Sequence, residues 1–201
     1  MLKIYNTLSK KIEDFIPINK SHIKIYVCGP TVYDKIHIGN ARPLVVFDTF
    51  VRLLKYKYPK VTYVRNITDV DDKINDRLIS EKITLKDLTD KTINDFQKDC
   101  TSLNNLYPDY EPRATEHISE MIKMIENLIL NEFAYLSKGH VLFNIKKFPE
   151  YGSLSNRTLD EMISGSRVEV ADYKINPGDF VLWKPSEQNI PCLLYTSDAA
   201  D

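Results

Sequence analysis

Two short β-rich runs that enclose one helical segment constrain the fold more than any other feature of this sequence. The run 23–28 ends at a Gly-Pro pair, as a buried strand that enters a loop does, and a second run covers 61–66. Between them, apolar residues recur at helical spacing across 41–56. Parallel strands need such a crossover connection, which is right-handed in nearly all proteins. The sequence therefore predicts a βαβ unit with a parallel sheet.

The loops that follow the two predicted strands are the expected binding region. Ligands of open parallel sheets bind beyond the carboxyl ends of the strands, which here means around residues 28–29 and 67–68. Asn40 is predicted to cap the helix, and Pro43 suits its first turn, where a missing N–H is tolerated. We therefore expect the helix to begin close to Asn40.

The second half of the sequence has a different pattern. Apolar residues three and four apart predict two long amphipathic helices, over 84–103 and 112–133. The runs 133–136 and 140–145 are separated by a Ser-Lys-Gly turn and predict a β-hairpin. A unit with antiparallel strands is thus expected after the parallel segment.

The change of pattern near residue 112 predicts two structural regions. Residues 1–112 would form the first part of a parallel-sheet domain, and residues 113–183 an inserted α+β unit with the start of a return to that domain. The last residues, 192–201, continue no earlier pattern. We interpret them as a non-native tail that is not part of the predicted fold.

Charge and cysteine content exclude several classes of protein. With 27 basic and 28 acidic residues the formal net charge is -1, so no overall positive field attracts nucleic acid, and any RNA contact has to be local. The cysteines Cys28, Cys100 and Cys192 lie at wide spacings that do not suggest a disulfide framework. No segment has the length and apolar character of a signal peptide or a membrane span. We expect a cytoplasmic protein without membrane contacts.

The segment from His37 to Asn40 lies at a loop-to-helix transition that can bind an anion. At a helix start, unpaired backbone N–H groups and the helix dipole favour a phosphate. Gly39 lets the backbone approach closely, while His37 and Asn40 can donate hydrogen bonds to charge that develops on a phosphoryl oxygen. The alternative is a helix-capping loop that carries an ordinary surface histidine.

Residues 68–72 contain three carboxylates and allow two interpretations. We favour the start of another helix, with Thr68 as the cap and Asp71 as its partner three residues later, over a metal site. Cys28 also allows two interpretations, because a cysteine at the end of a buried strand is either a small hydrophobic group or a functional thiol.

Five segments make the sequence specific for one family. They are, in order, YVCGPTVYDKIHIGNAR, YVRNITDVDDKI, EPRAT, YGSLS and DFVLWK. With these segments the sequence resembles bacterial-type cysteinyl-tRNA synthetases, which are class I aminoacyl-tRNA synthetases, from Ile4 to about Trp183. The resemblance implies an α/β fold with a Rossmann-like parallel sheet and an inserted connective unit. The chain would be the N-terminal fragment of that catalytic domain and contain the first half of the sheet.

The activity implied by the resemblance is ATP-dependent ligation of cysteine to tRNA(Cys) through a cysteinyl-adenylate. The implied ligands are ATP with magnesium, cysteine and tRNA, with most tRNA contacts outside this chain, and a monomer is expected. Two alternatives stay open, namely a cysteine ligase with an amino-sugar acceptor and a non-catalytic nucleotide-binding fragment. The sequence lacks the lysine-containing loop that acts on the triphosphate in this family, so we expect the chain alone to be inactive.

The resemblance also implies roles for individual residues. His37 and Asn40 would be catalytic, although most members of the family have histidine at the position of Asn40. The implied ATP-binding signature consists of Pro30, Thr31, His37, Ile38, Gly39 and Asn40. The residues expected to contact the cysteine substrate are Cys28, Gly29, Thr68 and Trp183. Cys28 would in addition be one of four zinc ligands, with the other three outside this chain.

Overall fold

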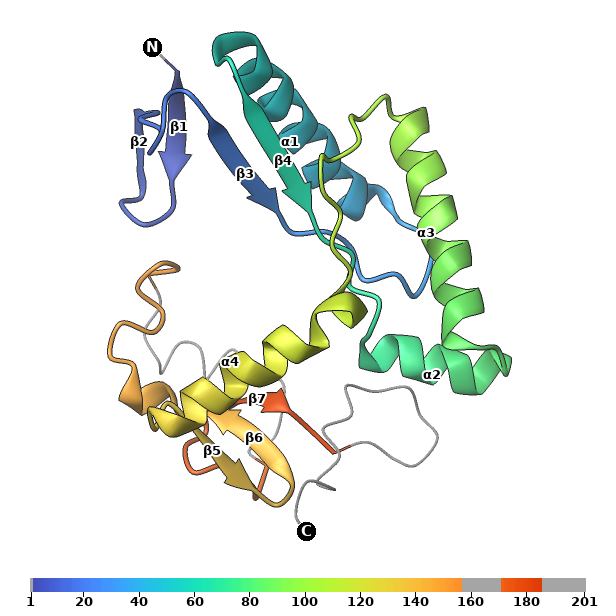
Figure 1. Cartoon of the computed structure of the whole chain (residues 1–201), viewed down its shortest axis with the longest axis vertical. Helices are drawn as coiled ribbons and strands as arrows, with labels where there is room; N and C mark the ends of the chain where they lie inside the picture. Colours follow the sequence, from blue (N-terminus) through green and yellow to red (C-terminus); the bar gives the residue numbers. More distant parts are fainter. Residues whose placement is uncertain (1, 157–170, 186–201) are drawn as a thin grey trace. The chain divides into compact units, whose positions relative to one another are not determined.

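The computed structural model describes residues 2–156 and 171–185 of the chain (Figure 1). By their internal contacts these residues divide into two compact units, of which the first spans Pro17–Ile118. Its elements are β3 (Ile23–Val27), α1 (Ile38–Lys57), β4 (Val61–Arg65), α2 (Asp72–Glu81), α3 (Leu85–Ser102) and the 3₁₀ helix η1 (Ala114–His117).

The second unit combines the residues up to Ile16 with those that follow Ile118. Its elements are β1 (Lys3–Asn6), β2 (Lys11–Asp14), most of α4 (Ile118–Leu130), β5 (Ala134–Ser137), β6 (His140–Phe143), the 3₁₀ helix η2 (Ile145–Lys147) and β7 (Phe180–Trp183). The domain boundaries expected from the sequence stay predictions. The expected tail 192–201, which contains Cys192, lies outside the described residues.

The first unit is built on a parallel pair of strands, as the sequence predicts. β3 and β4 pair in parallel, with Ile23 opposite Val61 and Val27 opposite Arg65, and α1 connects the two strands and packs against them (Figure 1). The segment 109–113 extends the pairing along β4 and beyond it through single parallel bridges. This βαβ arrangement confirms the predicted parallel α/β architecture.

The helix α1 begins earlier than predicted. Its first residue is Ile38 and its N-cap is His37, whereas Asn40, the predicted cap, is the third helical residue. Nδ1 of the His37 ring accepts a hydrogen bond from the backbone N–H of Gly39 at 3.0 Å. The imidazole thus fills the role that shorter polar side chains usually have at a helix start. Pro43 consequently lies inside the helix and not in its first turn.

The cap predicted for α2, Thr68, is also wrong. Asp71 caps this helix, with its carboxylate accepting from the N–H of Lys73 at 3.0 Å. Thr68 instead pairs with the loop after β3, because its N–H donates to the Pro30 carbonyl and its carbonyl accepts from Val32, both at 3.0 Å. These partners are distant in the sequence, so a local helix-start pattern does not include them.

Of the two long helices predicted, one is confirmed and the other is shorter than expected. The helix predicted over 84–103 is α3. In the range 112–133, α4 begins only after η1. The backbone before η1 is held against Ile67, whose N–H donates to the Pro112 carbonyl at 2.9 Å and whose carbonyl accepts from Ala114 at 3.1 Å. This pairing keeps the first residues of the predicted helix extended.

The second unit carries antiparallel sheets. The predicted hairpin is confirmed as β5 and β6, which turn at Lys138 and Gly139, both with positive φ. β7 extends this sheet, and the carboxylate of Asp179 just before it accepts hydrogen bonds from the Tyr135 hydroxyl at 2.7 Å and the Ile145 N–H at 3.2 Å. The other hairpin, β1–β2, is not among the elements expected from the sequence.

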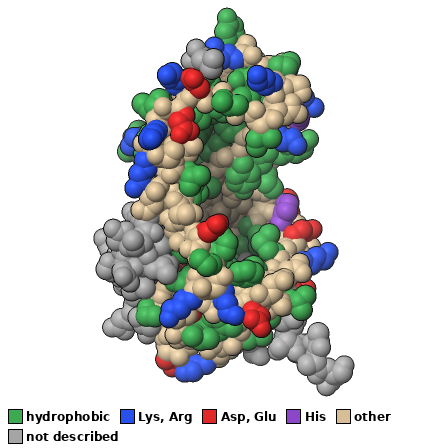
Figure 2. Space-filling view, turned by 90° about the vertical axis from the view of Figure 1, so that its left-hand side faces the viewer, with side chains coloured by type: hydrophobic (Ala, Val, Ile, Leu, Met, Phe, Trp, Pro, Cys, Tyr) green, Lys and Arg blue, Asp and Glu red, His purple; other side chains and the backbone are tan. Residues whose placement is uncertain are grey.

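Charged side chains of both signs mix on one face of the molecule. On the face shown in Figure 2, Lys and Arg groups are interspersed with Asp, Glu and hydrophobic groups. This distribution agrees with the formal net charge of -1. In the part of the chain that the structure describes, no helix combines the length and the apolar character that a membrane span requires.

Leu54 tests how far the first unit depends on the packing of α1. Its side chain is 1% exposed, whereas Val46 on the same helix is 55% exposed. We expect Leu54→Ala to lower the free energy of unfolding by about 2 to 5 kcal/mol, because it leaves a cavity, and Val46→Ala to change it by less than about 0.5 kcal/mol. Urea unfolding followed by circular dichroism measures both values. Equal losses in the two variants would contradict the packing described here.

Candidate functional site

A pocket of about 110 Å³ lies at the carboxyl end of β3, where the sequence predicts a ligand. It is lined by the end of β3, the loop after it, the start of α1 and one side chain of α3, namely Val27, Cys28, Gly29, Pro30, Gly39, Asn40, Pro43, Leu44 and Phe96. The Cys28 thiol is exposed, whereas Cys100 is buried, and burial raises the pKa of the Cys100 thiol. The structure thus brings the strand end and the helix start to one pocket.

His37 and Asn40 hold each other in place at the start of α1. The side-chain oxygen of Asn40 accepts a hydrogen bond from the His37 backbone N–H at 3.1 Å, and Nδ1 of His37 accepts from the Gly39 N–H at 3.0 Å. Because Nδ1 is an acceptor, the neutral ring carries its proton on Nε2. The His37 Nε2–H and the Asn40 amino group are therefore the ends that can donate to a ligand.

The start of α1 carries no compensating negative charge. No acidic residue lies in its first turn, so the positive end of the helix dipole is not neutralised there. His37 and Asn40 are both exposed. Together with the backbone N–H groups of the first turn, this arrangement can bind an anion such as a phosphate.

Gly29 is required where the two strand ends approach each other. A Cβ at this position would lie 1.6 Å from the carbonyl oxygen of Asn66, far inside contact distance. The Gly29 N–H donates to Asn66 Oδ1 at 2.8 Å, and Asn66 Nδ2 donates to the Thr68 hydroxyl at 3.2 Å. Asn66 therefore joins two of the predicted substrate contacts. Sequence reasoning missed it, and the signal for it is an amide side chain directly after a strand.

The remaining predicted site residues take different positions. Thr31 pairs with Thr68 in a parallel bridge, which aligns the loops after the two strands, and Ile38 is 87% exposed at the start of α1. None of these three residues lines the pocket, nor does His37. Trp183 is buried in β7, in the second unit. The predicted contacts of these residues with ATP or cysteine stay predictions.

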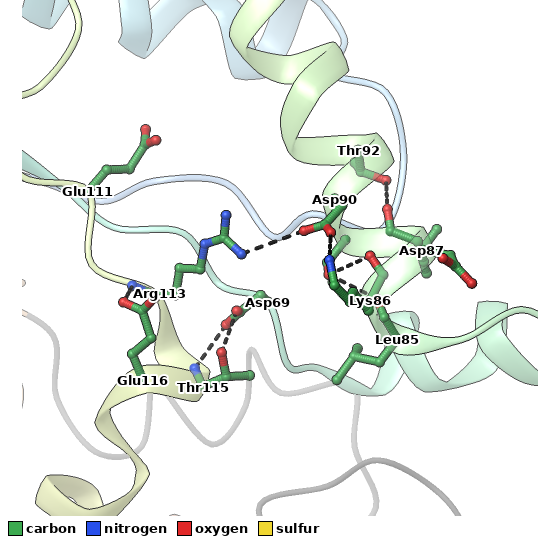
Figure 3. Close-up of polar contacts among 12 residues, drawn as sticks. Asp69, Leu85, Lys86, Asp87, Asp90, Thr92, Glu111, Arg113, Thr115 and Glu116 are labelled. Atoms are coloured by element: carbon green, nitrogen blue, oxygen red, sulfur yellow. Dashed lines mark hydrogen bonds and ion pairs between the residues drawn. The ribbon is translucent and has the colours of Figure 1, made fainter.

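The three carboxylates of residues 69–72 serve the fold. Asp69 is 4% exposed and accepts hydrogen bonds from the Thr115 N–H at 3.0 Å and from the Thr115 hydroxyl at 2.6 Å (Figure 3). Asp71 caps α2, and Asp72 is the first residue of that helix. The three carboxylates thus have separate structural roles, and only Asp71 and Asp72 belong to the predicted helix start, which begins three residues after Thr68.

Zinc needs four ligands in a structural site, and the described residues offer one candidate. Cys28 has an exposed thiol at the pocket, and a thiolate is a preferred zinc ligand. Within residues 2–156 and 171–185, no three His, Cys, Asp or Glu side chains lie together as a metal site. These residues alone therefore fit zinc at a single position.

Comparison with known proteins identifies similar sequences. Residues 14–194 match the family model described as tRNA synthetases class I (C) catalytic domain. The cysteine–tRNA ligase of Rhodospirillum rubrum is 55% identical over 190 residues, which cover 94% of this chain and 41% of that protein. Those of Paramagnetospirillum magneticum and Wolbachia pipientis are 56% and 53% identical over 94% of this chain, and 41% and 40% of their own length is covered. The chain spans less than half the length of these relatives.

His37 can be tested as a helix cap without any ligand. His37→Ala removes the Nδ1 acceptor, and we expect it to lower the free energy of unfolding by about 0.5 to 2 kcal/mol. His37→Asn supplies a side-chain oxygen that caps as well, so its stability should stay within about 0.5 kcal/mol of the wild type. Urea unfolding measures both variants. If His37→Ala is as stable as the wild type, the ring does not stabilise the start of α1.

Proposed function

The chain belongs to the class I tRNA synthetase catalytic-domain family of the cysteine–tRNA ligases, and on this basis we propose that the protein that carries it joins cysteine to tRNA(Cys) with the use of ATP. The β3–α1–β4 unit is accordingly part of a Rossmann-like α/β fold. One observation on this chain's own residues carries the proposal further. Cys28 and Asn40, predicted to bind cysteine and ATP respectively, line the same pocket.

The proposed reaction has two steps. A carboxylate oxygen of cysteine attacks the α-phosphorus of ATP, the bond to the β-phosphate breaks, and pyrophosphate leaves, which gives cysteinyl-adenylate. A hydroxyl oxygen of the terminal ribose of tRNA(Cys) then attacks the carbonyl carbon of the adenylate, loses its proton, and AMP leaves. Charge on the phosphate oxygens is stabilised best by hydrogen-bond donors that are already in position.

The start of α1 supplies donors of this kind. We assign the phosphates to Nε2–H of His37 and the amino group of Asn40, together with the backbone N–H groups of the first turn. Both side chains are fixed by the hydrogen bonds of the cap, so little rearrangement is needed when the nucleotide binds. The proposed ATP-binding segment also contains Pro30, Thr31, Ile38 and Gly39.

The strand-end side of the pocket is proposed to bind cysteine. Cys28 and Gly29 line the pocket there, and Asn66 links Gly29 to Thr68, the next proposed contact. Trp183 is proposed as a further contact with cysteine on the family resemblance alone. A pocket of about 110 Å³ suits a small side chain.

Two metals belong to the proposed reaction. Magnesium is proposed to accompany ATP, because it is a hard cation that phosphate oxygens bind well. Cys28 is proposed as one ligand of zinc, with the other ligands outside the described residues. When bound, zinc would supply a soft Lewis acid that prefers a thiolate to a hydroxyl.

The proposed partner is tRNA(Cys), bound mainly by parts of the protein outside this chain. The mixed charges on the face shown in Figure 2 and the net charge of -1 support this division, because the described residues provide no broad basic surface on that face. On the family resemblance we also propose that the protein is a monomer and lies in the cytoplasm.

The full-length protein should catalyse cysteine-dependent exchange of pyrophosphate into ATP and transfer cysteine to tRNA(Cys). His37→Asn keeps the helix cap but loses the Nε2 donor, so we expect kcat to fall by about a hundred- to a thousandfold. Radiolabelled pyrophosphate measures the exchange, with serine in place of cysteine as the control. No exchange with cysteine would contradict the proposal. Transfer to an amino sugar but not to tRNA would support the alternative ligase instead.

Cys28→Ser tests the proposed zinc ligand in the full-length protein. A hydroxyl is a poor zinc ligand, and groups that only orient a ligand are already worth about 10- to 100-fold in metal affinity, so we expect at least that loss. Atomic emission measures the zinc content of the purified protein. Cys100→Ser changes a buried thiol and should leave the zinc content unchanged. Wild-type zinc content in Cys28→Ser would mean that Cys28 is not a ligand.

A further inference from the structure

A charged side chain lies in the core beside the pocket, and the reaction proposed above gives it no task. Arg65, the last residue of β4, is 2% exposed, and its Nη2 donates to Glu111 Oε1 at 2.7 Å. Burial of a guanidinium is unfavourable unless a partner compensates for the lost water, and a hydrophobic side chain of similar volume often serves the fold equally well. Filling space in the core therefore does not by itself explain why a charged residue lies at position 65.

The Arg65 side chain supports two residues that line the pocket. Its guanidinium carbon lies 4.9 Å from the centre of the Phe96 ring, within cation–π distance. Its Cγ lies 3.3 Å from the point that a Cβ on Gly29 would occupy. Phe96 belongs to α3 and Gly29 to the loop after β3, and both line the pocket. One side chain thus lies over the Phe96 ring and beside Gly29, two parts of the pocket wall that come from different elements.

Glu111 holds the guanidinium against the Phe96 ring. It lies in the extended segment before η1 (Figure 3), where the Arg65 N–H donates to the Tyr110 carbonyl at 3.1 Å. Gln97 Nε2 donates to the second carboxylate oxygen of Glu111 at 3.3 Å. Burial by itself would lower the pKa of Arg65, but the hydrogen bond to Glu111 and neighbouring groups raise it above its ordinary value. The guanidinium stays charged in its buried position.

Hydrogen bonding alone does not explain where the guanidinium lies. Nε of Arg65 is buried without a hydrogen-bond partner among the described residues, and Nη1 lies 3.9 Å from the sulfur of Cys100. An unpaired buried donor is unfavourable, so hydrogen bonding alone would favour a position of the guanidinium in which Nε also has an acceptor. Besides the ion pair with Glu111, this position places the guanidinium over the Phe96 ring and the side-chain stem beside the Gly29 backbone.

We propose that Arg65 is a positioning residue that sets the width of the pocket lined by Cys28 and Asn40. Fixed by Glu111, it holds the Phe96 ring and the loop at Gly29 in place, so that the pocket accepts a small amino acid and excludes larger groups. The identity of that amino acid rests on the proposed function, whereas the pocket and its support do not.

The Cys28 thiol reports the pocket width in the 201-residue chain. Mass spectrometry follows its alkylation by iodoacetamide and by bulky iodoacetamidofluorescein, and the ratio of the two rates gives the size selectivity. Arg65→Met keeps an unbranched side chain but removes the charge, and should lower this selectivity by about threefold or more, equivalent to roughly 0.7 kcal/mol. Arg52→Met removes a surface ion pair of α1, with Asp48 at 2.7 Å, and should leave it unchanged.

Kinetics of the full-length protein give a second measurement. We expect Arg65→Met to raise KM for cysteine in pyrophosphate exchange by about tenfold and to leave KM for ATP within about twofold, because misplaced binding groups cost up to about a hundredfold. Arg65→Lys keeps the charge and should recover part of the loss. If the wild type shows no cysteine-dependent exchange, the proposed function fails, while the alkylation ratio still tests Arg65.

A wild-type alkylation ratio in an Arg65→Met chain that unfolds at the wild-type urea concentration overturns the inference. If Arg65→Met does not fold, Glu111→Gln replaces it, because this variant keeps the arginine and removes only the charge that fixes it. Lower size selectivity in Glu111→Gln supports the inference, and an unchanged ratio overturns it.

Discussion

The close approach of two backbones just beyond β3 and β4 determines the geometry of the pocket. Gly29 fits against the Asn66 carbonyl only because it has no side chain, and the pairing of Thr31 with Thr68 carries the parallel register into the loops. The loop that leads to α1 therefore starts from a fixed position and direction. The packing of α1 and α3 stabilises the unit, but this backbone contact brings the helix start to Cys28.

The sequence predicts the elements of the first unit because the necessary information is local. β-branched runs and helical periodicity suffice for β3, α1, β4 and α3. The starts of α1 and α2 are misassigned for two different reasons. His37 caps α1 through an imidazole nitrogen, although histidine is a less common N-cap residue than asparagine. Thr68 is kept extended by hydrogen-bond partners that are distant in the sequence. Likewise, α4 begins later in the sequence than predicted because the backbone before it pairs with Ile67.

The candidate site shows the same limit. That Cys28 and Asn40 meet at one pocket follows from the topology of a parallel sheet, which the sequence predicts. The supporting residues do not follow from it. An arginine at the end of a strand is normally exposed, and nothing near Arg65 in the sequence points to Glu111 or Phe96 as its partners. Such support depends on contacts between elements, and these exist only in the folded chain.

The hydrogen bond that begins α1 also limits what its histidine can contribute. Nδ1 of the His37 ring is occupied by the Gly39 N–H, so Nε2 is the ring nitrogen that is left to face a ligand. An anion at this helix start would therefore meet donors whose directions the cap has already fixed. The cap thus stabilises the helix and at the same time determines which side-chain atoms of the loop are left to orient a ligand.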